Sequence, residues 1–225
     1  AKCYTTDNLL LFTTLGNFLS IPVYKLFDNK WKEEGKHINE IGSVSNAEKI
    51  IGGILVSEFK EGANVILISK NGQIKRTAIN EFETPRIAKT SKCFNLSNND
   101  ELVGVGLTLG NSDILVTNSL GQASLFNEQD INLVSLKAGG IKSMTGLNED
   151  IYISSLLTFN DKENCKLGII TAQQGARLVD YTNITKTSRM GPKTALYKSF
   201  KSEPQICLNI FKFARKQEKM WVNVI

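Results

Sequence analysis

A hairpin-like unit recurs four times along this chain of 225 residues. Each copy contains an apolar, β-branched run, a turn that ends in glycine, and a second extended run. The turn glycines are Gly16, Gly72, Gly121 and Gly175, so successive copies are 56, 49 and 54 residues apart. Paired extended runs that recur about every 50 residues are typical of small antiparallel sheets arranged around an axis. This repeat limits the possible folds more than any other feature of the sequence.

The turn at Asn71-Gly72 is the strongest hairpin signal of the four. A tight primed turn needs positive φ at both central positions, and Asn and Gly both tolerate it. The "LG" turns at Gly16 and Gly121 and the "QG" turn at Gly175 are weaker versions, in which we expect glycine alone to adopt the positive φ.

Further β-rich runs lie outside the hairpins, at 50–59, 101–110, 150–159 and 204–213. No stretch longer than a turn or two has helical periodicity, so the sequence predicts an all-β, propeller-like fold in which blades are arranged around an axis. We expect one domain, residues 1–225, with about four blades of mostly four antiparallel strands plus a partial blade. The approximate repeats are 1–49, 50–100, 101–149, 150–203 and an incomplete 204–225, in which residues 220–225 resemble the first strand of a fifth hairpin.

Three windows of the chain are basic and contain no Asp or Glu. Residues 84–96, 132–145 and 185–198 carry three, two and four Lys or Arg residues, whereas the whole chain has a net charge of only +5. Each window contains a small residue followed within two positions by lysine, giving Lys92, Lys142 and Lys193, and Lys36 is the equivalent in the first copy. In that copy neighbouring acids offset the lysines, which is typical of a solvated surface.

Acid-free basic windows at one position of a cyclic repeat predict a positive belt that binds a polyanion. The first set of candidate contact residues comes from the three windows: Arg86, Lys89, Lys92, Lys137, Lys142, Lys186, Arg189 and Lys193. A second set follows the hairpin turns or belongs to the first copy: Lys75, Arg76, Arg177 and Lys36.

Catalytic and metal-binding classes find little support in the sequence. His37 is the only histidine, the four cysteines are far apart with no C-x-x-C pair, and no phosphate-binding glycine loop is present. The glycines of "GVGLTLG", which begins at Gly104, are expected to allow close packing of a strand. With no long apolar run and no signal-peptide pattern, we predict a cytoplasmic protein without membrane contacts, metal or catalytic residues.

Two other classes remain open on the residues alone. A propeller-like protein-interaction module could present the same basic loops to an acidic partner. A propeller enzyme that acts on sugars would need paired carboxylates at the axis, and the sequence contains no repeated inward acid.

The hairpin repeat and its basic glycine loops resemble the C-terminal β-pinwheel domain of the A subunit of bacterial type IIA topoisomerases. The resemblance covers nearly the whole chain and is carried by residues 9–38, by "ISKNGQIKRT" (68–77), by "LKAGGIKSM" (136–144), and by "TAQQGARLV" and "SRMGPKTAL". Gyrase carries a Q-R-R-G-G-K-G box, and "KAGGIKS" is the nearest match here but lacks its arginines. The resemblance therefore favours topoisomerase IV, with gyrase the alternative.

This resemblance implies a disk of four-stranded blades that exchange strands and whose basic rim bends duplex DNA. It further implies a non-catalytic domain that positions DNA for strand passage in decatenation, supercoil relaxation and chromosome segregation. The catalytic tyrosine would lie elsewhere in the same polypeptide, and the ATP and Mg of the holoenzyme would also bind outside this domain. The implied partners are duplex DNA, the rest of the A subunit and the B subunit, with a cytoplasmic, nucleoid-associated location.

Overall fold

The structure, a computed structural model, describes residues 2–30, 32–160, 165–198 and 205–214. Its strands form four antiparallel sheets, which confirms the all-β prediction. In sheet order, the first contains β3 (Ile50–Val56), β1 (Asn8–Thr13), β2 (Asn17–Pro22) and β6 (Ser91–Lys92), and the second contains β7 (Leu102–Thr108), β4 (Asn64–Ser69), β5 (Gln73–Ala78) and β10 (Ile141–Lys142). The third contains β11 (Ile153–Phe159), β8 (Asp113–Asn118), β9 (Gln122–Asn127) and β14 (Thr194–Ala195), and the fourth contains β15 (Cys207–Ala214), β12 (Cys165–Thr171) and β13 (Ala176–Asp180).

The helical elements are short and lie in the connections. They are α1 (Ile38–Ile41) and the 3-10 turns η1 (Val23–Lys25), η2 (Ile79–Phe82), η3 (Glu128–Asp130) and η4 (Tyr181–Asn183). No helix among the described residues is both long and apolar enough to cross a bilayer.

The four hairpins form where the glycine turns predict them, but the turn geometry differs from the prediction. Three residues separate β4 from β5, and Gly72, at φ +84°, donates its N–H to the carbonyl of Ser69 at 3.0 Å. Asn71 has no positive φ, so the expected primed two-residue turn is wrong; a single left-handed glycine closes a three-residue loop. In the fourth hairpin Gln174, not Gly175, adopts the positive φ of 59°.

Each sheet combines strands from two successive repeats of the sequence. The hairpin β4–β5, for example, pairs on one side with β7 and on the other with β10, both of which come from the next repeat. The same exchange joins β1–β2 to β3 and β6, and β8–β9 to β11 and β14. The sequence repeats therefore do not correspond to single sheets. The incomplete last repeat supplies β15, which pairs with β12 in the fourth sheet. Residues 220–225 lie outside the described residues.

Strand β4 explains why the hairpin runs are apolar at consecutive positions. All six of its residues are buried, and alternate side chains of a strand point to opposite faces of the sheet. Val65 and Leu67 contribute to a core shared with the first sheet, while Ile66 and Ile68 contribute to a core shared with the third. The sheets are therefore stacked face to face, with one hydrophobic core between each neighbouring pair.

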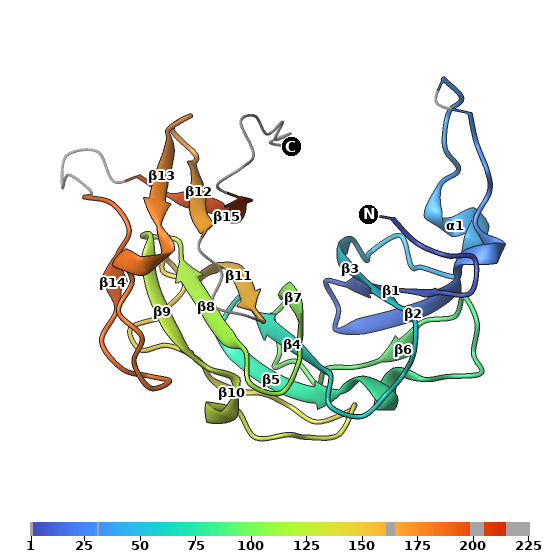
Figure 1. Ribbon diagram of the computed structural model, residues 1–225, viewed down its shortest axis with the longest axis horizontal. Coiled ribbons are helices and arrows are strands. Elements are labelled where there is room, and N and C mark those ends of the chain that lie inside the picture. The colour runs from blue at the N-terminus through green and yellow to red at the C-terminus, as the bar shows by residue number, and fades with distance from the viewer. Residues whose placement is uncertain (1, 31, 161–164, 199–204, 215–225) are drawn as a thin grey trace.

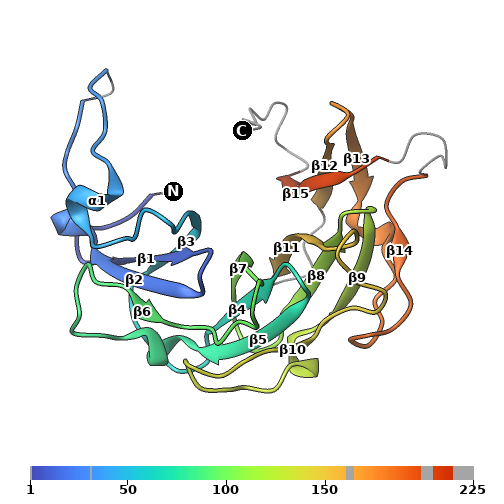
Figure 2. The same cartoon turned by 180° about the vertical axis from the view of Figure 1, so that it is seen from behind.

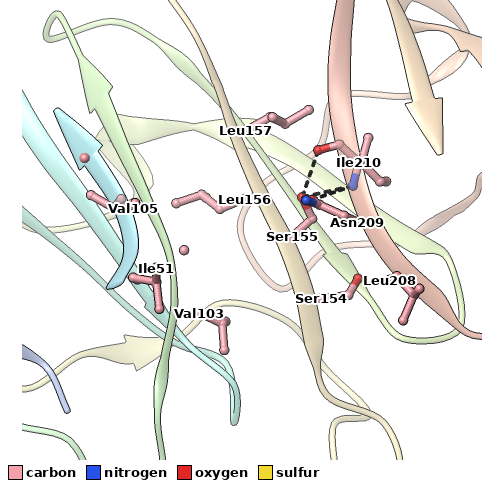
Figure 3. Close-up of a pocket in the computed structure, with 13 residues that line it drawn as sticks. Ile51, Val103, Val105, Ser154, Ser155, Leu156, Leu157, Leu208, Asn209 and Ile210 are labelled. Carbon is pink, nitrogen blue, oxygen red and sulfur yellow. Dashed lines mark hydrogen bonds between the residues drawn. The ribbon is translucent and has the colours of Figure 1, made fainter. Parts of the chain in front are cut away.

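The four sheets follow an arc in which β3, β7, β11 and β15 lie on the inside and β6, β10 and β14 on the outside (Figures 1 and 2). The inner strands line one shared pocket, as Figure 3 shows. A Cβ atom on Gly104 or Gly106 of β7 would lie within 2.8 Å of Leu156 or 2.4 Å of Thr158 on β11. The prediction that these glycines permit close strand packing is confirmed.

Candidate nucleic-acid interface

Each basic window lies along the outer strand of the hairpin that belongs to the previous repeat. Each window first forms an isolated parallel bridge with a hairpin strand, Ser20 to Ile87, Arg76 to Leu133 or Leu125 to Lys186. The first window makes a second such bridge, from Lys89 to Ser43. Each window then supplies the two-residue outer strand, β6, β10 or β14, which pairs antiparallel with β2, β5 or β9. The windows thus occupy equivalent positions on the outer side of the arc (Figure 1).

The turn glycines and the basic windows are directly linked. The carbonyl of Gly72 accepts the N–H of Ser143 at 2.9 Å, and the carbonyl of Gly121 accepts the N–H of Leu196 at 3.0 Å. The carbonyl of Gly16 does the same for Cys93. Gly72 has a positive φ, and a Cβ atom there would lie 2.2 Å from the terminal methyl of Leu147, so a side chain at this position would also force Leu147 to move. The turn glycines and the basic windows, which look like separate regularities in the sequence, therefore contact each other in the fold.

Most of the window cations are exposed to solvent. Of the eight window cations predicted to contact an anion, Arg86, Lys89, Lys92, Lys137, Lys142 and Lys186 are exposed, while Arg189 and Lys193 are half-buried; Lys198, the ninth cation of the windows, is also exposed. The side chains of the first five form no hydrogen bond or ion pair within the described part of the chain. They are therefore available to an external anion.

The other three predicted cations, Lys186, Arg189 and Lys193, make internal contacts. Lys186 forms an ion pair with Asp113. Arg189 donates its Nε to the carbonyl of Asp130 at 3.1 Å and a guanidinium N–H to the carbonyl of Lys142. Lys193 donates to the carbonyl of Thr145 at 3.1 Å. Arg189 and Lys193 of the last window thus lie against the backbone of the preceding window, at Lys142 and Thr145.

The predicted lysine series is only partly regular in space. Lys92 pairs with Asn17 and Lys142 with Gln73, so these two lysines occupy equivalent outer-strand positions. The equivalent residue of the last window is Ala195, and Lys193 lies two residues earlier. Lys193 therefore does not occupy the outer-strand position of Lys92 and Lys142.

Lys36 belongs to the segment between η1 and α1, which extends away from the sheets (Figure 1). Its Nζ lies 3.6 Å from a carboxylate oxygen of Glu40 and 4.1 Å from the ring centroid of Phe27. The described residues between β2 and β3 contribute no strand to a sheet, so Lys36 has no outer-strand position like that of Lys92. Arg177 is exposed on β13.

The prediction that Lys75 and Arg76 contact an external anion is corrected, because both side chains are buried. Lys75 is only 1% exposed, and its Nζ donates to four backbone carbonyls, those of Cys93, Ser135, Leu136 and Ala138, at 2.8–3.3 Å. Burial lowers the pKa of Lys75 to about 8, although Cys93 and Glu81 act in the opposite direction. Strand β5 lies inside a sheet that is covered on both faces, so cations just past the turn become buried.

Arg76 is paired with a carboxylate that sequence reasoning missed. Glu128 is fully buried, accepts from the N–H of Ser112 and the hydroxyl of Thr108 at 2.7 Å each, and lies 3.5 Å from the Arg76 guanidinium. The Asn64 amide donates to it as well, at 3.1 Å. These partners come from different strands, and no local sequence signal identifies such a network.

Acidic residues of two 3-10 turns accept backbone N–H groups from the basic window of the next repeat. Glu81 of η2 accepts the N–H of Leu136 at 3.3 Å, and Asp130 of η3 accepts the N–H of Arg189 at 2.8 Å. Both acids lie at the same position after their hairpin, so an alignment of the repeats on their turn glycines could have identified them.

Comparison with known proteins places this geometry among a defined group of domains. A family model described as the DNA gyrase C-terminal domain, a β-propeller, matches residues 7–57 and 63–108. The A subunit of DNA topoisomerase 4 from Bacillus subtilis (strain 168) is 28% identical over 216 residues, which are 96% of this chain and 26% of that protein. The same subunit from Staphylococcus epidermidis is 30% identical over 201 residues, covering 89% of this chain and 25% of that protein.

A solved structure agrees with these relatives. The crystal structure of the C-terminal domain of DNA topoisomerase IV has a TM-score of 0.83 and 29% identity, covering 92% of this chain and 64% of that one. The chain spans about a quarter of the length of the curated relatives that it matches.

Proposed function

Because this chain belongs to the family of C-terminal β-propeller domains found in the A subunits of gyrase and topoisomerase IV, we propose that it is a non-catalytic domain that binds and bends duplex DNA. The work of the domain would be to hold a DNA segment beside the cleaved one and to present it for strand passage. Decatenation, supercoil relaxation and chromosome segregation would be the activities of the holoenzyme.

One observation carries the proposal: three acid-free basic windows occupy equivalent outer-strand positions on one arc. Exposed lysine and arginine side chains bind duplex DNA mainly through its phosphates, which is independent of sequence. A curved row of such residues suits a bent duplex. Bending 20–30 base pairs costs on the order of 1 to 6 kcal/mol, which several phosphate contacts can offset.

The proposal assigns the remaining roles to other parts of the complex. ATP and Mg would act elsewhere in the holoenzyme, and the protein partners would be the rest of the A subunit and the B subunit. We propose a cytoplasmic, nucleoid-associated location, since the DNA substrate is found there.

The salt dependence of DNA binding tests the proposal. Of the eight predicted contact cations in the windows, five have no internal partner among the described residues and three make internal contacts. We therefore expect roughly 5 to 8 phosphates to be neutralised, with a slope of log K against log salt of about −4.5 to −7. Gel shifts with linear and circular duplexes at increasing salt would measure this slope. A slope near −1 would contradict a belt of contacts, and failure of non-specific duplex to compete with an acidic protein would favour the protein-interaction class.

A further inference from the structure

A single buried ammonium group lies beneath the basic loop 135–142. Lys75 is on β5, in the second sheet, and the loop comes from the following repeat, 60 to 63 residues later in the chain. Three of the four carbonyls bonded to its Nζ, those of Ser135, Leu136 and Ala138, belong to this one loop. The fourth belongs to Cys93 at the end of the preceding window.

These contacts account for the donors of the lysine. An ammonium group has three N–H donors and no acceptor, so three carbonyls at 2.8–3.0 Å satisfy it and the Ala138 carbonyl at 3.3 Å shares a donor. The Phe94 ring, whose centroid lies 5.6 Å from Nζ, contributes a further favourable contact with the cation. A buried charge needs such partners, because leaving it unpaired is costly.

The same loop is also held by an acid, which binds its backbone N–H rather than its carbonyls. Glu81 accepts the N–H of Leu136, so a cation and an anion of the second blade together bind the carbonyl group and the N–H of the same residue. The loop turn itself is closed by the N–H of Ala138 donating to the carbonyl of Ser135 at 3.1 Å. With its carbonyls directed to the buried lysine, the loop leaves the Lys137 side chain exposed.

The neighbouring sheets lack this device at the corresponding position. In β9, Ser124 pairs with Val116 as Lys75 pairs with Leu67 in β5, and the buried Ser124 hydroxyl has no hydrogen-bond partner among the described residues. In β2 the corresponding residue is Leu19, which pairs with Leu11. The last window is held instead by the contacts of Arg189 with Asp130.

We propose that Lys75 is a positioning residue for DNA binding: its buried ammonium fixes loop 135–142 so that Lys137 and Lys142 face the duplex. The proposal rests on the proposed DNA-binding function. Lys75 itself does not contact DNA. It acts through the two exposed lysines, so its effect must disappear when they are absent.

The test combines Lys75→Met with a double variant in a mutant cycle. Methionine keeps an unbranched apolar chain in the core and removes the ammonium. We expect Lys75→Met to weaken duplex binding about 3- to 10-fold in the otherwise unchanged chain, and less than 2-fold in a Lys137→Ala/Lys142→Ala background, because coupled residues give non-additive effects. An equal loss in both backgrounds would overturn the proposal. Lys70→Met is the matched control, since it removes one lysine from the same hairpin without contacting the loop.

Hydrogen exchange provides a readout that does not involve DNA. In Lys75→Met the amides of Leu136 and Ala138 should exchange at least about 10-fold faster, while those of Ile66 and Ile74 in the hairpin stay protected. Unchanged exchange at both loop amides would overturn the inference and leave the DNA-binding proposal standing. Conversely, a wild-type chain that does not bind duplex would overturn the proposed function and leave the loop measurement interpretable.

The wild-type chain offers a further readout that needs no variant. A hydrogen-bonded Lys75 ammonium should give a slowly exchanging Nζ resonance at about pH 6, in contrast to the exposed lysines. Its absence from the spectrum would contradict the hydrogen bonds on which the inference depends.

Discussion

Two groups of cations in this molecule have similar chemistry and opposite surroundings. Lys75 and Arg76 on β5 are buried, and they contact backbone carbonyls or Glu128. Lys137 and Lys142, in the loop that lies over them, are exposed and have no internal side-chain partner among the described residues. Positive charge in this sequence is therefore used in two ways: the buried cations bind groups inside the fold, and the exposed cations are available to an external anion. Mutations can test the two groups separately.

The largest expected effect comes from breaking the buried pair. Glu128→Ala leaves the Arg76 guanidinium without its carboxylate and removes the acceptor of the Ser112 N–H and the Asn64 amide. The Thr108 hydroxyl would keep only the Asn64 carbonyl, at 3.3 Å. We expect a loss of about 3 to 5 kcal/mol in the free energy of unfolding, measured by urea denaturation. A loss below about 1 kcal/mol would show that the network contributes little.

The exposed pair should behave in the opposite way. Lys137→Glu/Lys142→Glu should weaken duplex binding about 10- to 100-fold, equivalent to roughly 1.4 to 2.7 kcal/mol, and leave the unfolding midpoint nearly unchanged. Gel shifts and thermal melts measure the two properties. Lys49→Glu/Lys60→Glu is the control, because these lysines are also exposed but lie outside the windows. Unchanged affinity in the window variant would argue against the interface.

The contact that docks a window on its hairpin can be tested at a glycine. Gly72 and Gly62 both have positive φ, but only a Cβ atom at Gly72 would meet Leu147. Gly72→Ala should therefore cost about 1 to 2 kcal/mol more in unfolding free energy than Gly62→Ala. Equal losses would mean that the Leu147 side chain, two residues past the window, can shift to accept the extra methyl group.

The smallest expected effect is a pH dependence of stability. Burial lowers the pKa of Lys75 to about 8, below its ordinary value of 10.5, so between these values the unfolded chain binds more protons than the folded one. The contribution of Lys75 should therefore make the folded state more stable as pH rises from 8, by about 1 kcal/mol per pH unit at most. Comparing urea denaturation of the wild type and Lys75→Met at about pH 7 to 9 isolates this group. A difference that is constant with pH would place the pKa of Lys75 outside that interval.

Much of the fold could be predicted from local patterns. Glycine turns between apolar runs predict the hairpins, because a left-handed glycine is a local requirement of the chain. The predicted turn type at Asn71 was wrong, and so was the residue expected to have positive φ in the fourth hairpin, where Gln174 adopts it. Several geometries can close the same two strands, and the sheet chooses among them.

The number of hairpins, the positions of the basic windows and the resemblance to the family can all be predicted from the order of the residues. Which cations lie in the interior follows from the packing of the strands. Lys75 and Lys137 each follow a large apolar residue in the sequence. Lys75 is nevertheless enclosed by strands and loops from two repeats, whereas Lys137 faces solvent. The physical reason is strand exchange: the environment of Lys75 is completed by chain that lies 18 to 63 residues away.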